Sequence, residues 1–440
     1  MRRSRRMVTH YFTLKALTRE LDASFRHSTI REAFPQPKNE LIITTERVQS
    51  GDAPAGLFSL HVSVDPQSNY IFVEERNSRA KRNSADVFQE LAGSTVRAFT
   101  IQPFDRTLNL ALQDGRILLI QLYDSAASNV YLTDEHLTIL NAFKDRKRLE
   151  RTHLRPTERQ FDQAILDDLQ SFRGAVRTST AETSFPALKA AVPVLGSTFA
   201  REALHRANVG EHARMRDVDE VGIERMFHEV RGIFASTEQQ GAFIYYRGTG
   251  PAVLSVMPLQ HLSGARSEQF DSVNRAIKSF IGGARRSRTF ETEKNELLTA
   301  LRKELERARR SLEVAQRRAS DSSRAEEYER SGRLVMGNLY RIEKGADRVD
   351  LSDPYPEGRT VTIALNPALT PARNAAEYFE KARKARLALR EADARIESLN
   401  TKVRLVEKMV LHLDNCHTKE QVSEFKKEYA RMSKGTEIGE

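Results

Sequence analysis

The stretch IQPFDRTLNLALQDGRILLIQLY, residues 101–123, is typical of a β-hairpin. Every second residue from 108 to 112 is leucine, which is the period of a strand that buries one face. Asp114 and Gly115 then predict a type I′ turn, after which RILLIQLY continues the sheet and NVYL extends it. The stretch therefore predicts a half-buried antiparallel sheet.

An acid and a base, Asp105 and Arg106, stand directly before the first strand of this hairpin. In a regular strand Arg106 shares the face of Leu108, whereas Asp105 shares the face of Asn109. The two side chains then diverge, which argues against a mutual salt bridge and for two separate partners. Composition alone leaves both a surface ion pair and a recognition site open.

The composition is that of a polar, basic protein. The 440 residues are enough for two to four domains, and 39% are hydrophobic and 30% charged. No apolar run reaches the roughly 18 residues that a membrane span needs. The net charge of +10 and the pI near 9.6 favour an acidic partner, with nucleic acid as the first candidate. A generically basic protein without a polyanionic partner is the alternative.

The N-terminus and the cysteine content both favour the cytoplasm. MRRSRRM is basic but lacks the apolar core of a secretory signal, and either Met1 or Met7 can serve as the start. Cys416 is the single cysteine, so an intramolecular disulfide is excluded. One thiol beside two histidines falls short of a zinc site, and we expect no metal.

Residues 1–180 have the pattern of an α+β domain. Leucine and phenylalanine recur at helical spacing in 11–25, and 40–48, 56–64 and 69–76 are expected strands. SADVFQELAG predicts a short helix over 84–92 that ends at Gly93. Residues 181–284 are expected to be mostly helical, with a glycine turn before a helix in 194–209 and a small hairpin in 242–259.

Residues 285–440 have the spacing of a coiled coil. Apolar residues alternate spacings of three and four over 298–315 and again over 389–413. The segment between them has turn signals, so one antiparallel helical hairpin with a small β element at about 331–372 is the economical interpretation. Two separate parallel coiled coils are the alternative. Thr370 and Pro371 are expected to start the returning helix, with Tyr378 and Phe379 packed on the opposing arm.

Three segments resemble the NFACT family, which includes the fibronectin-binding-protein-A-like and RqcH-like factors of ribosome quality control. They are 11–44, 80–110 with its FDR element, and 331–351 together with VTIALNPALTPARNAAEYFEKARKAR at 361–386. The resemblance implies a MutM-like NFACT-N domain over 1–180 and a helix-hairpin-helix-like domain over 181–284, opened by LGSTFAREALHRA. A coiled-coil middle domain is implied over 285–440.

The resemblance also implies a function. Such proteins bind obstructed large ribosomal subunits that carry peptidyl-tRNA and recruit tRNA, commonly alanyl-tRNA in bacteria, to extend the stalled chain without mRNA. The implied partners are that subunit, tRNA and rRNA, with no membrane and no small-molecule cofactor. The residues implied for tRNA binding are Asp105, Arg106, Lys81, Arg82, Ser128 and Asn129.

This chain departs from the family pattern in two places. LYDSAASNV keeps only Ser128 and Asn129 of a family motif, and the chain ends at Glu440, where members continue into an NFACT-R domain. The sequence leaves open whether the NFACT-R domain is naturally lost or the chain is truncated. It also leaves open whether the activity that extends the stalled chain is retained.

No pattern of a conventional enzyme is present. The sequence has no Walker loop, GxGxxG, HExxH or GxSxG, and neither start supplies the N-terminal proline of MutM-like glycosylases. We expect no catalytic residues, since in the family peptidyl transfer is ribosomal. Positioning RNA needs cations, although a solvated helix face is the alternative for each candidate. The candidates for ribosome or RNA binding are Arg285, Arg286, Arg288, Lys381, Arg383, Lys384 and Arg386.

A cell-surface fibronectin-binding, adhesin-like interaction protein is the alternative function. No signal peptide, anchor motif or cysteine framework supports it.

Overall fold

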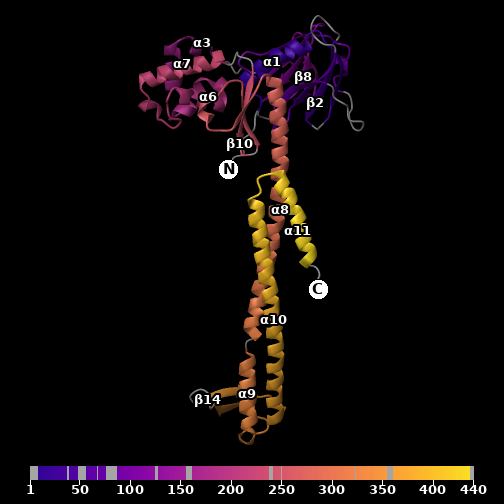
Figure 1. Cartoon of the computed structure of the whole chain (residues 1–440), viewed down its shortest axis with the longest axis vertical. Helices are drawn as coiled ribbons and strands as arrows, with labels where there is room; N and C mark the ends of the chain where they lie inside the picture. The colour runs from indigo at the N-terminus through magenta and orange to yellow at the C-terminus, as the bar shows by residue number, and fades with distance from the viewer. Residues whose placement is uncertain are drawn as a thin grey trace. The chain divides into compact units, whose positions relative to one another are not determined.

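The computed structural model describes residues 8–36, 39–47, 56–66, 68–75, 87–123, 127–154, 161–236, 241–248, 250–322, 324–353 and 360–436. The chain divides into two compact units, Met1–Arg288 and Thr289–Glu440 (Figure 1).

The first unit contains two antiparallel meander sheets, in each of which the strands follow chain order. The first sheet consists of β1 (Thr29–Pro35), β2 (Glu40–Arg47), β3 (Gly56–Ser63) and β4 (Tyr70–Glu75). The second consists of β5 (Val96–Ile101), β6 (Thr107–Leu112), β7 (Ile117–Gln121), β8 (Asn129–Thr133) and β9 (Ile139–Ala142). The predicted strands and hairpin are confirmed.

The hairpin turn differs from the type I′ prediction. Gly115 has a φ of +89°, but Asp114 is not among the residues with positive φ. The Asp114 carboxylate instead accepts the backbone N–H of Arg116 at 3.1 Å and that residue's guanidinium at 2.6 Å. This local pairing favours a turn with one left-handed residue over the two that type I′ requires.

The predicted helix over 84–92 is also wrong in its described part. Only the 3₁₀ turn η1 (Gln89–Leu91) forms, because Phe88 directly before it has a left-handed φ of +51°.

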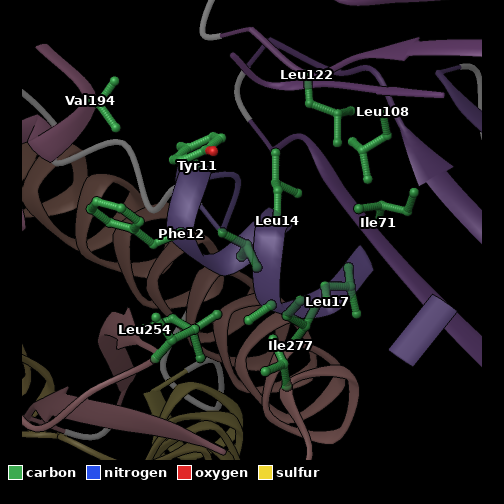
Figure 2. Packing of buried hydrophobic residues seen from close by; sticks show 14 of the residues in the cluster. Tyr11, Phe12, Leu14, Leu17, Ile71, Leu108, Leu122, Val194, Leu254 and Ile277 are labelled. Atoms are coloured by element: carbon green, nitrogen blue, oxygen red, sulfur yellow. The ribbon is translucent and has the colours of Figure 1, made fainter. Parts of the chain in front are cut away.

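Helix α1 (Tyr11–Phe25) carries the predicted apolar stripe into the core. Leu14, Leu17, Leu21 and Phe25 are fully buried, and each such side chain contributes about 1.5–3 kcal/mol. Figure 2 shows α1 surrounded by apolar side chains from both sheets and from later elements, among them Ile277.

A series of helices follows the sheets, and all of them except α2 contribute residues to the shared core. They are α2 (Arg146–Leu149), α3 (Ala164–Asp167), α4 (Leu169–Arg177), α5 (Ser184–Ala191), η2 (Pro193–Leu195), α6 (Gly196–Arg206), η3 (Met215–Asp217) and α7 (Glu220–Ser236). A single hydrophobic cluster extends from Val8 to Ile281, across the predicted boundary at residue 180, which stays a prediction.

A small sheet completes the first unit. The predicted hairpin is β10 (Ala242–Arg247) with β11 (Gly250–Ser255), and β12 (Ser267–Phe270) pairs with the other edge of β10, after the turn η4 (Gln260–Leu262).

Gly196 allows the starts of α1 and α6 to approach closely. It has a φ of +57°, and a Cβ there would lie 2.8 Å from Nε2 of His10. His10 caps α1: its Nδ1 accepts the N–H of Phe12 at 3.4 Å, and its Nε2 donates to the carbonyl of Leu195 at 2.9 Å. These bonds require the neutral imidazole, and burial lowers the pKa of His10 to about 4.

Glu202 in α6 is a fully buried carboxylate held by four donors. It accepts the Nε of Arg206 at 2.6 Å, the N–H of Gln260 at 2.8 Å, and both the N–H and Nδ1 of His261 at 3.1 and 2.6 Å. Burial alone would raise the pKa of Glu202, but these bonds together lower it to about 2.

Two residues fasten the first turns of α8 (Val273–Ser322) within the first unit. The Glu20 carboxylate accepts the N–H groups of Val273 and Asn274 at 2.7 and 3.0 Å. The Asn274 amide accepts from the N–H of Val73 at 2.7 Å and donates to its carbonyl at 2.9 Å. Val73 lies in the edge strand β4, so α8 begins on that edge.

The second unit is the predicted antiparallel helical hairpin with a β element. It contains the rest of α8, then α9 (Ala325–Gly337), η5 (Leu339–Arg341), β13 (Arg348–Ser352), β14 (Thr360–Ala364), α10 (Pro371–Asp414) and α11 (Lys419–Thr436). Arg302 pairs with Asp414 and Arg309 with Glu407, so residue numbers rise along α8 as they fall along α10. This pairing excludes two separate parallel coiled coils. Helix α11 was not predicted.

The structural contacts expected of Thr370, Tyr378 and Phe379 are present. Thr370 caps α10 by accepting the N–H of Arg373 at 3.4 Å. The Tyr378 hydroxyl donates to the carbonyl of Ala364 at 2.6 Å, and Phe379 packs on Gly332 of α9. In Figure 1 α9 and α10 lie side by side near β14.

We expect Gly196→Ala to lower the free energy of unfolding of the first unit by about 2–3 kcal/mol, since the new Cβ would meet His10 in a left-handed backbone. Thermal unfolding followed by circular dichroism measures this. Gly174→Ala is the matched control, because it lies in α4 with nothing within 4 Å and should stabilise by roughly 0.5–1 kcal/mol. Equal effects of the two substitutions would contradict the assignment.

We expect Glu202→Gln to destabilise the protein at neutral pH by on the order of 3 kcal/mol. The folded pKa of about 2 lies below the ordinary 4.5, so the stabilisation is complete above pH 4.5 and is lost as the pH falls toward 2. The difference in free energy of unfolding between wild type and variant, measured by urea unfolding, should therefore become smaller as the pH falls from 4.5 to 2. Glu220→Gln, which removes a carboxylate that is 57% exposed, should show a small gap throughout. A constant Glu202→Gln gap from pH 6 to 3 would refute the assignment.

Candidate functional site

The loop between β5 and β6 holds the FDR sequence in a tight turn. The N–H of Gln102 donates to the carbonyl of Thr107 at 2.9 Å, and the N–H of Asp105 donates to the carbonyl of Gln102 at 3.2 Å. Pro103 suits the second position of such a turn because its ring fixes φ. Phe104 occupies the third position with a φ of +57°, which costs a non-glycine residue about 1–2 kcal/mol.

Aromatic packing offsets the strain at Phe104. Its ring centroid lies 5.1 Å from that of Phe161, 5.8 Å from Tyr11 and 6.4 Å from Phe234. Such pairs contribute about 0.5–1.5 kcal/mol each beyond the area that they bury. The ring therefore anchors the loop to α1 and α7, and Asp105 follows in a fixed position.

Asp105 is buried and accepts two hydroxyl hydrogen bonds on one oxygen. Thr107 Oγ1 and the Tyr123 hydroxyl each lie 2.8 Å from its Oδ2. Buried carboxylates need such donors to remain stable. Within the described part of the chain, the other oxygen, Oδ1, makes no hydrogen bond, so it can accept one from a ligand.

Arg106 lies against the same tyrosine. Its guanidinium carbon is 5.9 Å from the centre of the Tyr123 ring, within cation–π range. Its positive charge also contributes, after burial, to the lowered pKa of His10. The predicted divergence of Asp105 and Arg106 is thus only partly correct. Asp105 bonds the hydroxyl of Tyr123 and Arg106 contacts its ring, so both interact with different groups of one residue.

Tyr123 was not among the predicted site residues, although it ends the quoted stretch. Its carbonyl accepts from Asn69 Nδ2 at 2.7 Å and from the Ser128 hydroxyl, and Asn69 in turn accepts from Thr9 at 3.1 Å. The register of the β6–β7 hairpin could have identified Tyr123 from the sequence. Thr107 pairs with Gln121, and Tyr123 follows two residues later, near the loop that carries Asp105.

The side chains of Ser128 and Asn129 bond to backbone groups, that of Ser128 to the carbonyl of Tyr123. Both are buried, and Asn129 bonds both the N–H and the carbonyl of Lys144, at 2.9 and 3.0 Å. The geometry gives them a supporting role, and their direct contact with tRNA stays a prediction. Lys81 and Arg82 lie outside the described residues.

The predicted cations of α8 are divided between two environments. Arg285 bonds the Tyr70 hydroxyl and lies 3.8 Å from the buried Glu40, so it belongs to a structural cluster, although its side chain remains 60% exposed. Arg286 and Arg288 are exposed.

The predicted cations of α10 are exposed in the second unit. Arg383 pairs with Glu380 at 3.0 Å and Arg386 pairs with Glu329 of α9, whereas Lys381 lies 5.1 Å from the Tyr378 ring centre. Lys384 is exposed as well. Surface pairs of this kind contribute little to stability, so these side chains can exchange partners.

The described residues contain no cluster of three or more side chains suited to a metal ion. None of the helices among them is long and apolar enough to span a bilayer.

Tyr123→Phe should lower the free energy of unfolding by about 1.5–3 kcal/mol, because the buried Asp105 loses one of two donors. Thermal unfolding checks this. Tyr11→Phe is the control, since in the described structure the Tyr11 hydroxyl makes no hydrogen bond although the ring is equally buried. Identical melting of Tyr123→Phe and wild type would contradict the proposed bonding.

Comparison with known proteins places the chain in a family. The family model described as "NFACT N-terminal and middle domains" matches residues 10–434. "Rqc2 homolog RqcH" from Bacillus subtilis (strain 168) is 25% identical over 234 residues, which cover 52% of this chain and 38% of the relative. The protein of the same name from Streptococcus suis (strain 05ZYH33) is 31% identical over 109 residues, which cover 25% and 20%. The matches therefore span less than half the length of these relatives.

Solved structures similar to this chain include "the fibrinogen binding protein from Staphylococcus aureus", with 15% identity and a TM-score of 0.47 over 61% of this chain and 97% of that one. The N-terminal part of the fibronectin/fibrinogen-binding protein from Streptococcus suis has 16% identity and a TM-score of 0.42 over 62% and 98%. Because its family model covers nearly all of the chain, the protein belongs to the NFACT family.

Proposed function

We propose that this protein is a ribosome-associated quality control factor. It binds obstructed large ribosomal subunits that carry peptidyl-tRNA and recruits tRNA, alanyl-tRNA in this proposal, for template-free C-terminal tailing of the stalled chain. Membership of the NFACT family and the name of its curated relatives support the role. The observation that carries it is the Asp105–Arg106 loop, held rigid by Phe104 and Tyr123.

The loop suits recognition of RNA. Arg106 supplies a cationic, planar group for a phosphate or a base edge, and Asp105 supplies an acceptor for an amino or hydroxyl group. Because Phe104 and Tyr123 fix the loop before binding, little conformational entropy is lost when RNA is bound. The protein has a positioning role here, and peptidyl transfer is assigned to the ribosome.

The proposal gives the remaining predicted cations a separate role. Lys381, Arg383, Lys384 and Arg386 on α10, with Arg286 and Arg288 on α8, are assigned to ribosomal RNA. Neutralising phosphates releases counterions, so association should weaken steeply with salt. The proposed location is the cytoplasm, where the ribosomes are.

The test is tRNA binding by Asp105→Asn and Arg106→Gln. Asparagine keeps an oxygen for Thr107 and Tyr123, so folding should be retained. Each variant should lower the affinity for tRNA by about 10-fold, in keeping with the 1–3 kcal/mol of a specific contact. Fluorescence anisotropy with labelled tRNA measures this, with thermal unfolding as the check on folding.

Arg97→Gln is the matched control. It removes the same charge as Arg106→Gln, from an exposed residue on the neighbouring strand β5. Normal tRNA binding by both site variants would refute their role. Failure of the wild-type chain to co-sediment with large ribosomal subunits would refute the ribosomal function itself.

A further inference from the structure

Two exposed arginines, Arg266 and Arg286, lie near Tyr246 in the small sheet of the first unit. Tyr246 pairs with Pro251 of β11, and on its other side its N–H donates to the carbonyl of Arg266 at 2.9 Å. The guanidinium of Arg266 lies over the Tyr246 ring, 4.7 Å from its centre. Arg266 itself is exposed, so an aromatic ring and a planar cation are stacked at the surface.

Helix α8 brings a second arginine to this place. A Cβ at Gly283 would lie 3.1 Å from the Pro251 ring, so α8 passes closely over β11 beside Tyr246. Arg286 follows one turn later and is near enough for its charge to act on the Tyr246 phenol, countering the rise in pKa that burial and Glu268 cause. Arg286 is exposed and makes no hydrogen bond or ion pair with any other described residue.

One acid stands within the group. Glu268 accepts the Tyr246 hydroxyl at 2.6 Å and so fixes the ring in place. The two positive charges of Arg266 and Arg286 exceed the negative charge of Glu268.

We propose that Tyr246, Arg266 and Arg286 form an RNA-binding surface that takes an unpaired nucleotide and its flanking phosphates. Unpaired bases stack on aromatic rings and on guanidinium planes, and arginines pair with the phosphates on either side. The stacked ring and cation favour a nucleobase over an acidic protein segment, which offers carboxylates but no planar group of this size. The inference rests on the proposed function only in taking RNA as the partner.

The test uses a fluorescently labelled 12-residue oligouridylate with the whole chain, in anisotropy titrations at several KCl concentrations. The double variant Arg266→Gln/Arg286→Gln should bind about 10-fold more weakly, and its salt dependence should be shallower by about 1.4 in log Kd per log[KCl], since two phosphate contacts are lost. Tyr246→Leu should weaken binding about 10-fold with the salt dependence unchanged, and Tyr246→Phe should restore it.

The control is Arg225→Gln/Arg231→Gln on α7, which removes the same charge from two exposed arginines, one of them 5.5 Å from the Phe227 ring centre. An equal loss in this control, normal binding by Arg266→Gln/Arg286→Gln, or no binding by wild type would overturn the proposal. Displacement of the RNA by polyglutamate at equal charge concentration would overturn it in favour of an acidic protein.

The outcome is separable from that of the ribosomal function. Wild-type binding of oligouridylate without co-sedimentation with large subunits would leave this surface in place and refute the ribosomal role. Co-sedimentation of the wild type, together with unimpaired oligouridylate binding by the double variant, would support the ribosomal role and refute the proposed surface.

Discussion

The close approach of His10 to Gly196 is the contact on which the first unit depends. It sets the start of α1 against the start of α6, and a side chain at position 196 would prevent it. From that point α1 extends into the core, with its apolar stripe between the two sheets. Phe12, next but one to His10, meets Phe199 of α6 and Phe234 of α7. The loop that carries Asp105 is anchored in the same aromatic group.

Periodicity predicted the elements whose pattern is unbroken. The stripe of α1, the β6–β7 hairpin and the antiparallel arms all follow from regular spacing. Strands β1 and β5 were not predicted, and both contain a register shift that breaks the alternation. The turn at Gly115 and the failed helix before η1 were decided by the left-handed backbone of single residues, which spacing does not reveal.

The candidate site was only partly accessible to sequence reasoning. Adjacent charges and the family resemblance identified Asp105 and Arg106. Tyr123, which holds both, is brought to them by strand pairing, and its hydrogen bonds depend on the three-dimensional fold. The same reasoning could not separate Arg285, which faces the buried Glu40, from Arg286 one residue on, because both are basic residues of one helix.

The bonding of Asn274 to Val73 has a consequence for solubility. An edge strand normally exposes unpaired N–H and carbonyl groups to which a strand of another molecule can add. The Asn274 amide occupies both groups of Val73, in the way that a neighbouring strand would. The first turn of α8 therefore blocks this edge of the first sheet. The residue that holds the helix in place, Asn274, also protects the protein against edge-to-edge aggregation.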